Sequence, residues 1–193
     1  MNLADRLVAA LLWVLAVLVI AGITHIVAIF ALPEFAAKDT YARVLDLAKP
    51  AQLALVPPVR ADQQYIPFAD PAMMQAVCPF DLSQGGLRLH ADVEGDRLLM
   101  LSFRTRAGRG FYSMTDLAAQ QGKIDVVALT AAQLETVESE DDEDNPSQDL
   151  RLVAPDTQGF VIISSLAAYP GERADAEERL KPVSCGIEHI GQD

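Results

Sequence analysis

The residues LVAALLWVLAVLVIAGITHIVAIFAL, at positions 7–32, form a continuous apolar run without a single Asp, Glu, Lys or Arg. An α-helix rises about 1.5 Å per residue, so a run of this length can cross a hydrocarbon layer about 30 Å thick. The run predicts a transmembrane helix over residues 7–32, preceded by a short N-terminal tail over residues 1–6. A membrane, crossed once, is therefore the first expected partner of the chain.

A cleaved secretory signal is the main alternative interpretation of this run. Such a signal has a shorter apolar core, a basic front and small residues just before the cleavage site. Here the front carries an acidic residue beside its basic one, and cleavage after Ala36 or Ala37 would place Glu34 or Phe35 where a small residue is needed. We therefore favour an uncleaved anchor. A buried core helix is a weaker alternative, because helices that are apolar on every face belong in lipid or in large cores.

The charge of the chain limits the partners of its remaining part. It carries 27 acidic and 15 basic residues, a formal net charge of -12. This balance argues against nucleic acid as a partner and against a domain surface that adheres to anionic lipid. Basic residues flank the apolar run on both sides, so their count does not decide the orientation of the helix in the membrane.

Two cysteines, Cys78 and Cys185, lie near the two ends of the region beyond the apolar run. A disulfide between them would close nearly this whole region and stabilise it by about 2–4 kcal/mol. Two buried free thiols in a reducing compartment are the alternative. We favour the bridge, and with it a domain exported from the cytoplasm. His90 and His189 have no ligand-like spacing with the cysteines, so neither a metal nor another cofactor is predicted.

A connector is predicted over residues 33–65. Within it, Thr40 can cap a short amphipathic helix over residues 41–48. Its apolar face would consist of Tyr41, Val44, Leu45 and Ala48. This face could lie on the membrane surface or, as is more usual, against the domain. An Asp-Pro pair at Asp70 predicts the start of another short helix that continues to Cys78.

From residue 87 onward, apolar residues recur at every second position, as in a strand with one buried face. The turn at residues 94–96 predicts a hairpin into a second strand that is apolar on both faces and therefore central. The predicted strands cover residues 87–93, 97–104, 111–114, 124–129, 150–153 and 159–166, and short helices begin at Thr130 and cover residues 171–181. The predicted fold is an α+β, mainly β, domain over residues 66–193. It would be an antiparallel sandwich, jelly-roll-like, with a few short helices.

The acidic run ESEDDED at residues 138–144 predicts a solvated loop. Clustered carboxylates also suggest a calcium site. The spacing of an EF-hand loop, with its glycine and terminal glutamate, is missing from this run, so a solvated loop is the preferred interpretation.

No catalytic motif such as GxSxG, HExxH or a phosphate-binding glycine loop occurs in the sequence, so enzymatic activity is not predicted. The feature nearest to a site is a set of arginines in and around the loop RTRAGRGF. They are Arg88, Arg97, Arg104, Arg106 and Arg109. Arginine side chains bind carboxylates or phosphates, so these residues are a candidate anion-binding site. Pairing with carboxylates of the same domain is the alternative interpretation.

Three stretches carry a resemblance to a known family. They are PFADPAMMQAVCPFDL, LLMLSFRTRAGRGFYSMTDLAA and GFVIISSLAAYPG, together with a cysteine near the end. With the preceding apolar run, this order resembles the short, membrane-anchored members of a bacterial family known only as domain of unknown function family twelve fifty-four. The resemblance implies a jelly-roll-like β domain at the bacterial inner membrane and a companion membrane-anchored protein. It implies no catalytic residues.

Two functions from different classes follow. The first is a non-enzymatic envelope protein with a single span and a periplasmic β domain that works by contact, with a companion membrane protein as partner. The second is a domain that binds or hydrolyses a small anionic ligand on the arginine-rich strand face.

Overall fold

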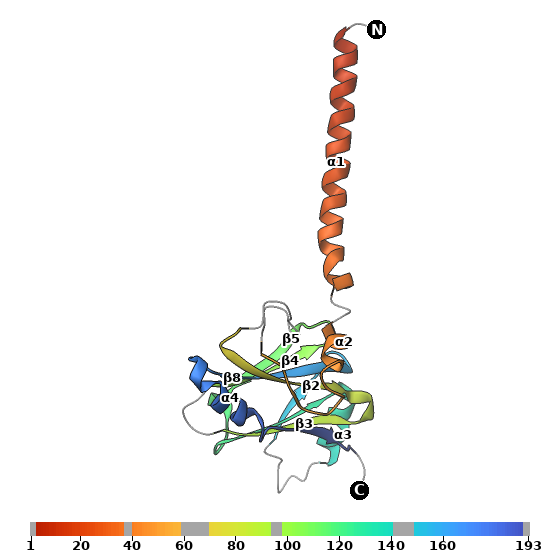
Figure 1. The fold of residues 1–193 in the computed structure, drawn as a ribbon. Helices are drawn as coiled ribbons and strands as arrows, with labels where there is room; N and C mark the ends of the chain where they lie inside the picture. The colour runs from red at the N-terminus through yellow and green to blue at the C-terminus, as the bar shows by residue number, and fades with distance from the viewer. Residues whose placement is uncertain (1–2, 37–39, 59–69, 94–97, 141–148, 191–193) are drawn as a thin grey trace. The chain divides into compact units, whose positions relative to one another are not determined.

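A computed structural model describes the chain over residues 3–36, 40–58, 70–93, 98–140 and 149–190. The chain divides into two compact units, Met1–Lys38 and Asp39–Asp193. The first unit is a helix and the second is a β-rich domain, as the sequence predicts (Figure 1).

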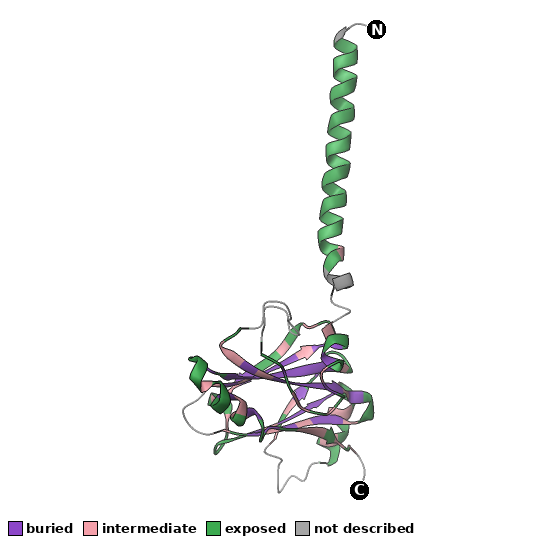
Figure 2. Ribbon diagram, viewed as in Figure 1, coloured by how far each residue is buried: buried purple, intermediate pink, exposed green. Residues whose placement is uncertain are grey.

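The helix of the first unit, α1 (Leu3–Ala36), exposes its apolar side chains along its length (Figure 2). The segment Ala4–Leu32 is long and apolar enough to cross a membrane, a property that uncleaved anchors share with signal sequences. The helix begins within the predicted tail of residues 1–6 and continues past Pro33. A proline removes one hydrogen bond from a helix without forbidding the turn that follows it.

The second unit consists of two facing sheets (Figure 1). The five-stranded sheet has, in spatial order, β1 (Ala54–Leu55), β2 (Met73–Asp81), β8 (Gln158–Leu166), β4 (Leu99–Thr105) and β5 (Gly110–Thr115). The four-stranded sheet has β7 (Leu150–Val153), β6 (Lys123–Leu129), β3 (Gly86–Asp92) and β9 (Ser184–Glu188). Neighbouring strands are antiparallel except β6 and β7, which are parallel. The mainly β, largely antiparallel fold class is confirmed.

Short helices precede the first strand or connect later strands. They are α2 (Thr40–Leu45), α3 (Ala131–Glu140) and α4 (Arg173–Leu180), with single turns at η2 (Leu82–Gln84), η3 (Asp116–Ala118) and η4 (Pro170–Glu172). The helix predicted after Thr130 is α3, and its capping is reciprocal. The Gln133 N–H donates to Thr130 Oγ1 over 3.2 Å, and the Thr130 N–H donates to Gln133 Oε1 over 2.9 Å. This helix links the parallel strands β6 and β7, a crossover that the sequence did not predict.

The main core lies between the two sheets and consists of side chains at alternate positions of the facing strands. Figure 2 shows the buried residues on the strands of both sheets. Leu101 and Phe103 of β4 and Leu87 and Leu89 of β3 are fully or almost fully buried there. A second, smaller cluster covers the outer face of the five-stranded sheet. It consists of Tyr41, Val44, Ala48, Val56, Val77, Phe160 and Ile162. Two clusters explain why β2 and β8 are apolar on both faces.

The predicted connector belongs in part to the domain. Tyr41 and Val44 of α2 are buried against the five-stranded sheet, whereas Leu45 is 40% exposed. The Tyr41 hydroxyl donates to the Phe80 carbonyl over 3.1 Å. The amphipathic face therefore docks on the domain, the more usual of the two alternatives. The helix is shorter than predicted, because α2 ends at Leu45 rather than at residue 48.

The prediction of a helix from Asp70 to Cys78 is wrong, since these residues lead into β2. The local signal was genuine: Asp70 Oδ1 accepts from the Ala72 N–H over 2.8 Å, and its carbonyl accepts from the Met73 N–H over 3.0 Å. This turn starts a strand because the apolar residues after it pair with β8 on one side and β1 on the other. Long-range pairing overrides a helix-start signal of this kind.

The predicted hairpin between residues 87–93 and 97–104 is also wrong. Residues 94–97 lie outside the described residues, but the strands that flank them, β3 and β4, belong to different sheets. Alternation shows that a strand has one buried face without identifying the strand that pairs with it. The hairpin is instead formed by β4 and β5, whose register shifts between Phe103 and Arg104.

The acidic run begins within a helix rather than a loop. Glu138, Ser139 and Glu140 form the exposed last turn of α3, and residues 141–144 lie outside the described residues. The prediction of a solvated loop therefore starts too early, because the capped helix continues to Glu140.

Candidate binding cleft

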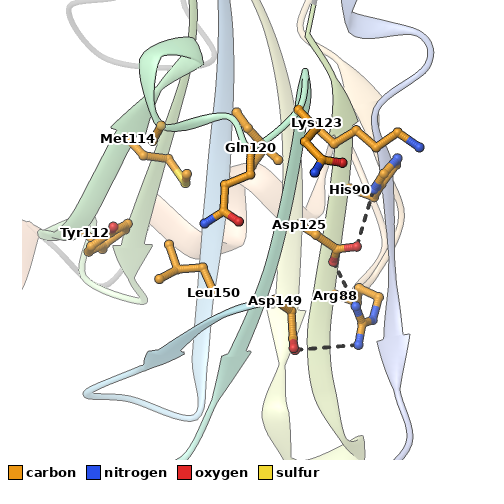
Figure 3. A pocket seen from close by; sticks show the side chains of 12 residues that line it. Arg88, His90, Tyr112, Met114, Gln120, Lys123, Asp125, Asp149 and Leu150 are labelled. Atoms are coloured by element: carbon orange, nitrogen blue, oxygen red, sulfur yellow. Dashed lines mark hydrogen bonds and ion pairs between the residues drawn. The ribbon is translucent and has the colours of Figure 1, made fainter. Parts of the chain in front are cut away.

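A cleft of about 610 Å³ opens at one side of the sandwich, between β5 of the five-stranded sheet and β6 of the other sheet (Figure 3). A hollow of this size is typical of ligand sites in proteins. Its lining comes from β3, β5, β6, η3, the turn after η3 and the start of β7. The lining residues are Arg88, His90, Tyr112, Met114, Ala118, Gln120, Gln121, Lys123, Ile124, Asp125, Asp149 and Leu150.

One wall of the cleft is apolar. Met114 and Tyr112 lie opposite Leu101 and Phe103 of β4, so all four side chains emerge on the inner face of the sheet. Met114 is 8% exposed, whereas Tyr112 at the rim is 36% exposed. The Tyr112 ring meets the Phe103 ring edge-on, with centroids 6.2 Å apart. This packing holds the Tyr112 ring in place at the mouth of the cleft.

The opposite wall is polar, and Arg88 of β3 organises it. The Arg88 guanidinium donates from Nε and Nη2 to the two carboxylate oxygens of Glu188, over 2.7 and 3.0 Å. Its Nη1 donates to Asp125 Oδ1 over 2.8 Å (Figure 3). The hydrogen bonds to Glu188 raise the pKa of Arg88 above its ordinary value. The same bonds hold the pKa of Glu188 below its ordinary value.

His90 lies between Asp125 and Asp92. Its Nδ1 is 3.5 Å from Asp125 Oδ2, and its Nε2 is 3.6 Å from Asp92 Oδ1. Because Leu87 and Leu89 point into the core, Arg88 and His90 emerge on the outer face of the four-stranded sheet. The polar wall thus belongs to the outer face of one sheet, and the apolar wall to the inner face of the other.

Asp149 directly precedes β7 and lies in the polar wall of the cleft, near Arg88. Its side chain is 8% exposed, and its Oδ2 is 3.8 Å from both Arg88 Nη2 and Arg151 Nε. Its buried Oδ1 has no hydrogen-bond partner among the residues that the structure describes. A buried carboxylate oxygen of this kind costs free energy and favours a nearby positive charge.

The cleft carries no arrangement typical of nucleophilic catalysis. Its described lining contains no serine, threonine or cysteine beside His90. Within the described ranges, no group of three or more His, Cys, Asp and Glu residues is placed to hold a metal ion. The cleft can bind a ligand or a segment of another protein. It offers the Tyr112 ring at its rim, an apolar floor at Met114 and a carboxylate, Asp125, held by Arg88.

The arginines singled out from the sequence occupy different places. Arg88 belongs to the cleft, on the outer face of the four-stranded sheet. Arg104 and Arg106 lie on the β4–β5 hairpin of the other sheet, and Arg109 is exposed there. Arg97 lies outside the described residues. The described arginines therefore do not gather into one pocket, and anion binding by them stays a prediction.

Two of the hairpin arginines contact the domain itself. Arg104 Nη1 donates to the Gly108 carbonyl over 3.2 Å. Arg106 donates to Gln158 Oε1, and its guanidinium lies 5.7 Å from the centroid of the Tyr41 ring. Arg104 thus braces the hairpin itself, and Arg106 links the hairpin to β8 and α2, so both arginines have a structural role.

Most residues of the cleft were not singled out from the sequence. Asp125 occupies the outward position of a strand, where a solvated carboxylate is ordinary, and Tyr112 lies in a strand that reads as half-buried. The sequence of β5, GFYSMT, lacks a clear alternation of apolar and polar residues, which gave little indication of a site. The cleft is formed by strands that are distant in the sequence, and the sequence of one strand does not show which strands lie beside it.

Comparison with known proteins informs the fold alone. No family model matches the chain, and no curated protein matches it. The crystal structure of the VPA0106 protein from Vibrio parahaemolyticus is similar, with a TM-score of 0.55 and 7% sequence identity over 79% of this chain and 35% of that chain. An uncharacterized protein from Burkholderia cenocepacia has a TM-score of 0.43 and 12% identity over 69% of this chain and 34% of that chain. The chain thus spans about a third of the length of these two structures.

Proposed function

We propose that this chain is a membrane-anchored protein of the bacterial envelope whose β domain works by contact with another protein. The observation that carries the anchor is the exposure of α1. Between Leu7 and Leu32, every large apolar side chain of this helix is more than half exposed. Exposed apolar surface of this extent requires lipid or a partner to cover it.

The location of the domain outside the cytoplasm rests on the disulfide between Cys78 and Cys185. Disulfides persist in oxidising compartments such as the periplasm and are rare in the cytosol. Cysteine labelling of intact cells, with and without reductant, tests this location. A periplasmic domain gives labelling by an impermeant reagent only after reduction. Free thiols that react only after the inner membrane is opened would contradict it.

A contact function is supported by what the cleft offers, which is an aromatic rim and an apolar floor beside a wall of charged side chains. The proposed partner is a companion membrane-anchored protein, as the resemblance to the family twelve fifty-four implies. The test is purification of the full chain from native membranes in a mild detergent. The proposal predicts one stoichiometric partner protein, and a clean, partner-free chain would count against it.

Binding of a small ligand is the second candidate function, and the 610 Å³ volume of the cleft favours it. An anionic ligand held by the hairpin would lose its binding when Arg104 and Arg106 are replaced by alanine. A ligand held in the cleft would keep its binding in that variant and lose it in Tyr112→Ala. These two variants therefore separate the two locations.

A further inference from the structure

The two sides of the sandwich are closed in different ways. On one side, the disulfide between Cys78 of β2 and Cys185 of β9 ties the two sheets together. On the other side lie β5 and β7, the last strands of their sheets. Within the described residues, β5 pairs with β4 alone and β7 pairs with β6 alone. The cleft thus opens on the side of the sandwich where, among the described residues, neither β5 nor β7 has a further strand beside it.

The edge of β5 lacks the features that usually protect such an edge. Edge strands are commonly blunted by lysines, prolines, inward-pointing charges or bulges. The sequence of β5, GFYSMT, contains no charged residue and no proline. Its register shift lies at its start, beside Arg104, and leaves the stretch from Tyr112 to Thr115 regularly paired with β4. This stretch presents outward N–H and C=O groups to a further strand.

Apolar side chains surround this edge. Leu117, in the η3 turn that follows β5, is 91% exposed, Leu150 at the start of β7 is 38% exposed and Tyr112 is 36% exposed. Met114 and Ile124 form a buried floor between them. Tyrosine is enriched in the cores of protein interfaces, so Tyr112 above this apolar floor is suited to contact a partner.

The charge of the polar wall indicates the sign of the occupant. The Arg88 guanidinium is already engaged by both oxygens of Glu188 and by Asp125. Asp149 is buried and has an oxygen without a described hydrogen-bond partner. The wall carries the carboxylates of Asp92, Asp125, Asp149 and Glu188 against the cations Arg88, Arg151 and Lys123, so a basic side chain is favoured over an acidic one. A second copy of this chain is disfavoured as occupant, because each copy carries a net charge of -12.

We propose that the cleft binds an extended segment of a partner protein, which adds as a strand to the free edge of β5. Its apolar side chains would cover Met114 and contact Tyr112 and Leu117. A lysine or arginine of the segment would lie toward Asp125 and Asp149. Strand addition of this kind obtains affinity from main-chain hydrogen bonds and specificity from alternate side chains. This inference rests on the proposed contact function and assigns its site.

The test uses the full chain in nanodiscs of zwitterionic phosphatidylcholine, with empty nanodiscs as the blank. Three synthetic peptides serve as probes: acetyl-TVKVRVT-amide, its acidic counterpart acetyl-TVEVEVT-amide, and the basic peptide N-methylated at alternate residues. Methylation removes the donors that pair with a strand edge and keeps the side chains. Binding is measured by fluorescence anisotropy of labelled peptides.

The inference predicts that the basic peptide binds at least about tenfold more tightly than the acidic peptide and that the methylated peptide does not bind. Tyr112→Ala and Leu117→Ser each weaken binding of the basic peptide about tenfold. Because Leu117 is almost fully exposed, its variant folds as the wild type does. Tyr169→Ala, which removes an aromatic residue that is 70% exposed outside the cleft, leaves binding unchanged.

Several results would overturn the inference. They are the absence of binding by the basic peptide, equal binding of all three peptides, and unchanged binding in both Tyr112→Ala and Leu117→Ser. Two further variants carry a photo-crosslinking residue, one at position 117 and one at position 169. They distinguish failure of the cleft as the binding site from failure of the contact function itself. Cross-links to the co-purified partner from position 169 alone would keep the contact function and reject the cleft as its site. Cross-links from position 117 alone support the inference.

Discussion

Cys78 in β2 and Cys185 in β9 are joined by a disulfide that crosses from one sheet to the other, with their Cα atoms 6.6 Å apart and a sequence separation of 107. Cys78 is fully buried, and its neighbours in β2 pair with β8 in the middle of the five-stranded sheet. The bond therefore ties β2, the second strand of one sheet, to β9, the edge strand of the other. It closes the chain from residue 78 to residue 185 into one loop.

Removal of this disulfide is expected to destabilise the domain strongly. The Cys78→Ala, Cys185→Ala double variant should lose about 2–4 kcal/mol of unfolding free energy, because the unfolded chain regains the freedom of a very long loop. Urea unfolding of the full chain, followed by circular dichroism in the sheet region, measures this loss. Tryptophan emission is unsuitable, since the single Trp, Trp13, lies in α1. An unchanged urea midpoint would contradict the prediction.

Gly159 in β8 is expected to tolerate no side chain. A Cβ at this position would lie 2.3 Å from the Arg104 carbonyl oxygen and 2.5 Å from Phe80 Cζ, and backbone cannot move aside cheaply. Gly159→Ala should therefore destabilise the domain by about 1–3 kcal/mol or more. Gly186 in β9 is the matched control, because nothing lies within 4 Å of a Cβ built there. Equal urea midpoints for the two alanine variants would contradict this account of β8.

The pair of Arg88 and Glu188 is expected to make stability depend on pH. Hydrogen bonds from Arg88 hold the pKa of Glu188 below its ordinary value of 4.5. A carboxyl group whose pKa is lower in the folded state contributes fully to the stability of the domain at a pH above its pKa in the unfolded state. That contribution is lost as the pH falls through its pKa in the folded state. Glu188→Gln should therefore be less stable than the wild type at pH 7 by about 1 kcal/mol, a figure kept small because both side chains are about a third exposed.

The difference in stability between Glu188→Gln and the wild type should shrink as pH falls below 4.5, the ordinary pKa of this glutamate, toward its lower pKa in the folded state. Urea midpoints from pH 7 to pH 3 measure this change. Adding Arg88→Met to both proteins completes a double-mutant cycle, whose coupling should be near 1 kcal/mol at pH 7 and vanish at low pH. A coupling that stays constant over this range would mean that the pair does not act through its charges.

The sequence predicts strands well where one face is wet and the other dry. The alternation of Leu87, Leu89 and Ala91 with polar residues identified β3, and Thr130 with Gln133 identified the start of α3. Both features depend only on residues close together in the sequence, so distant contacts do not change them. At Asp70 the local signal was equally clear and was misinterpreted, because a capped turn can lead into a strand as well as into a helix.

The arrangement of the strands and the cleft could not be predicted in the same way. β3 pairs with β6 and β9 rather than with β4, the next strand in the chain, and a period of two is the same for every partner. Arg88 was singled out as a cation, but its partner Glu188 is 100 residues away in the sequence. Whether Arg88 was free for a ligand or already paired depended on that distant contact, which a single sequence does not reveal.

The central claim is that the N-terminal helix stays attached and holds the domain to a membrane. The direct measurement is the intact mass of the chain recovered from its native host, in carbonate-washed membranes and in the soluble fraction. The account predicts a chain that retains α1 and remains in the washed membranes. A chain that has lost the residues of α1 and is recovered in the soluble fraction would contradict the account and identify the helix as a secretion signal.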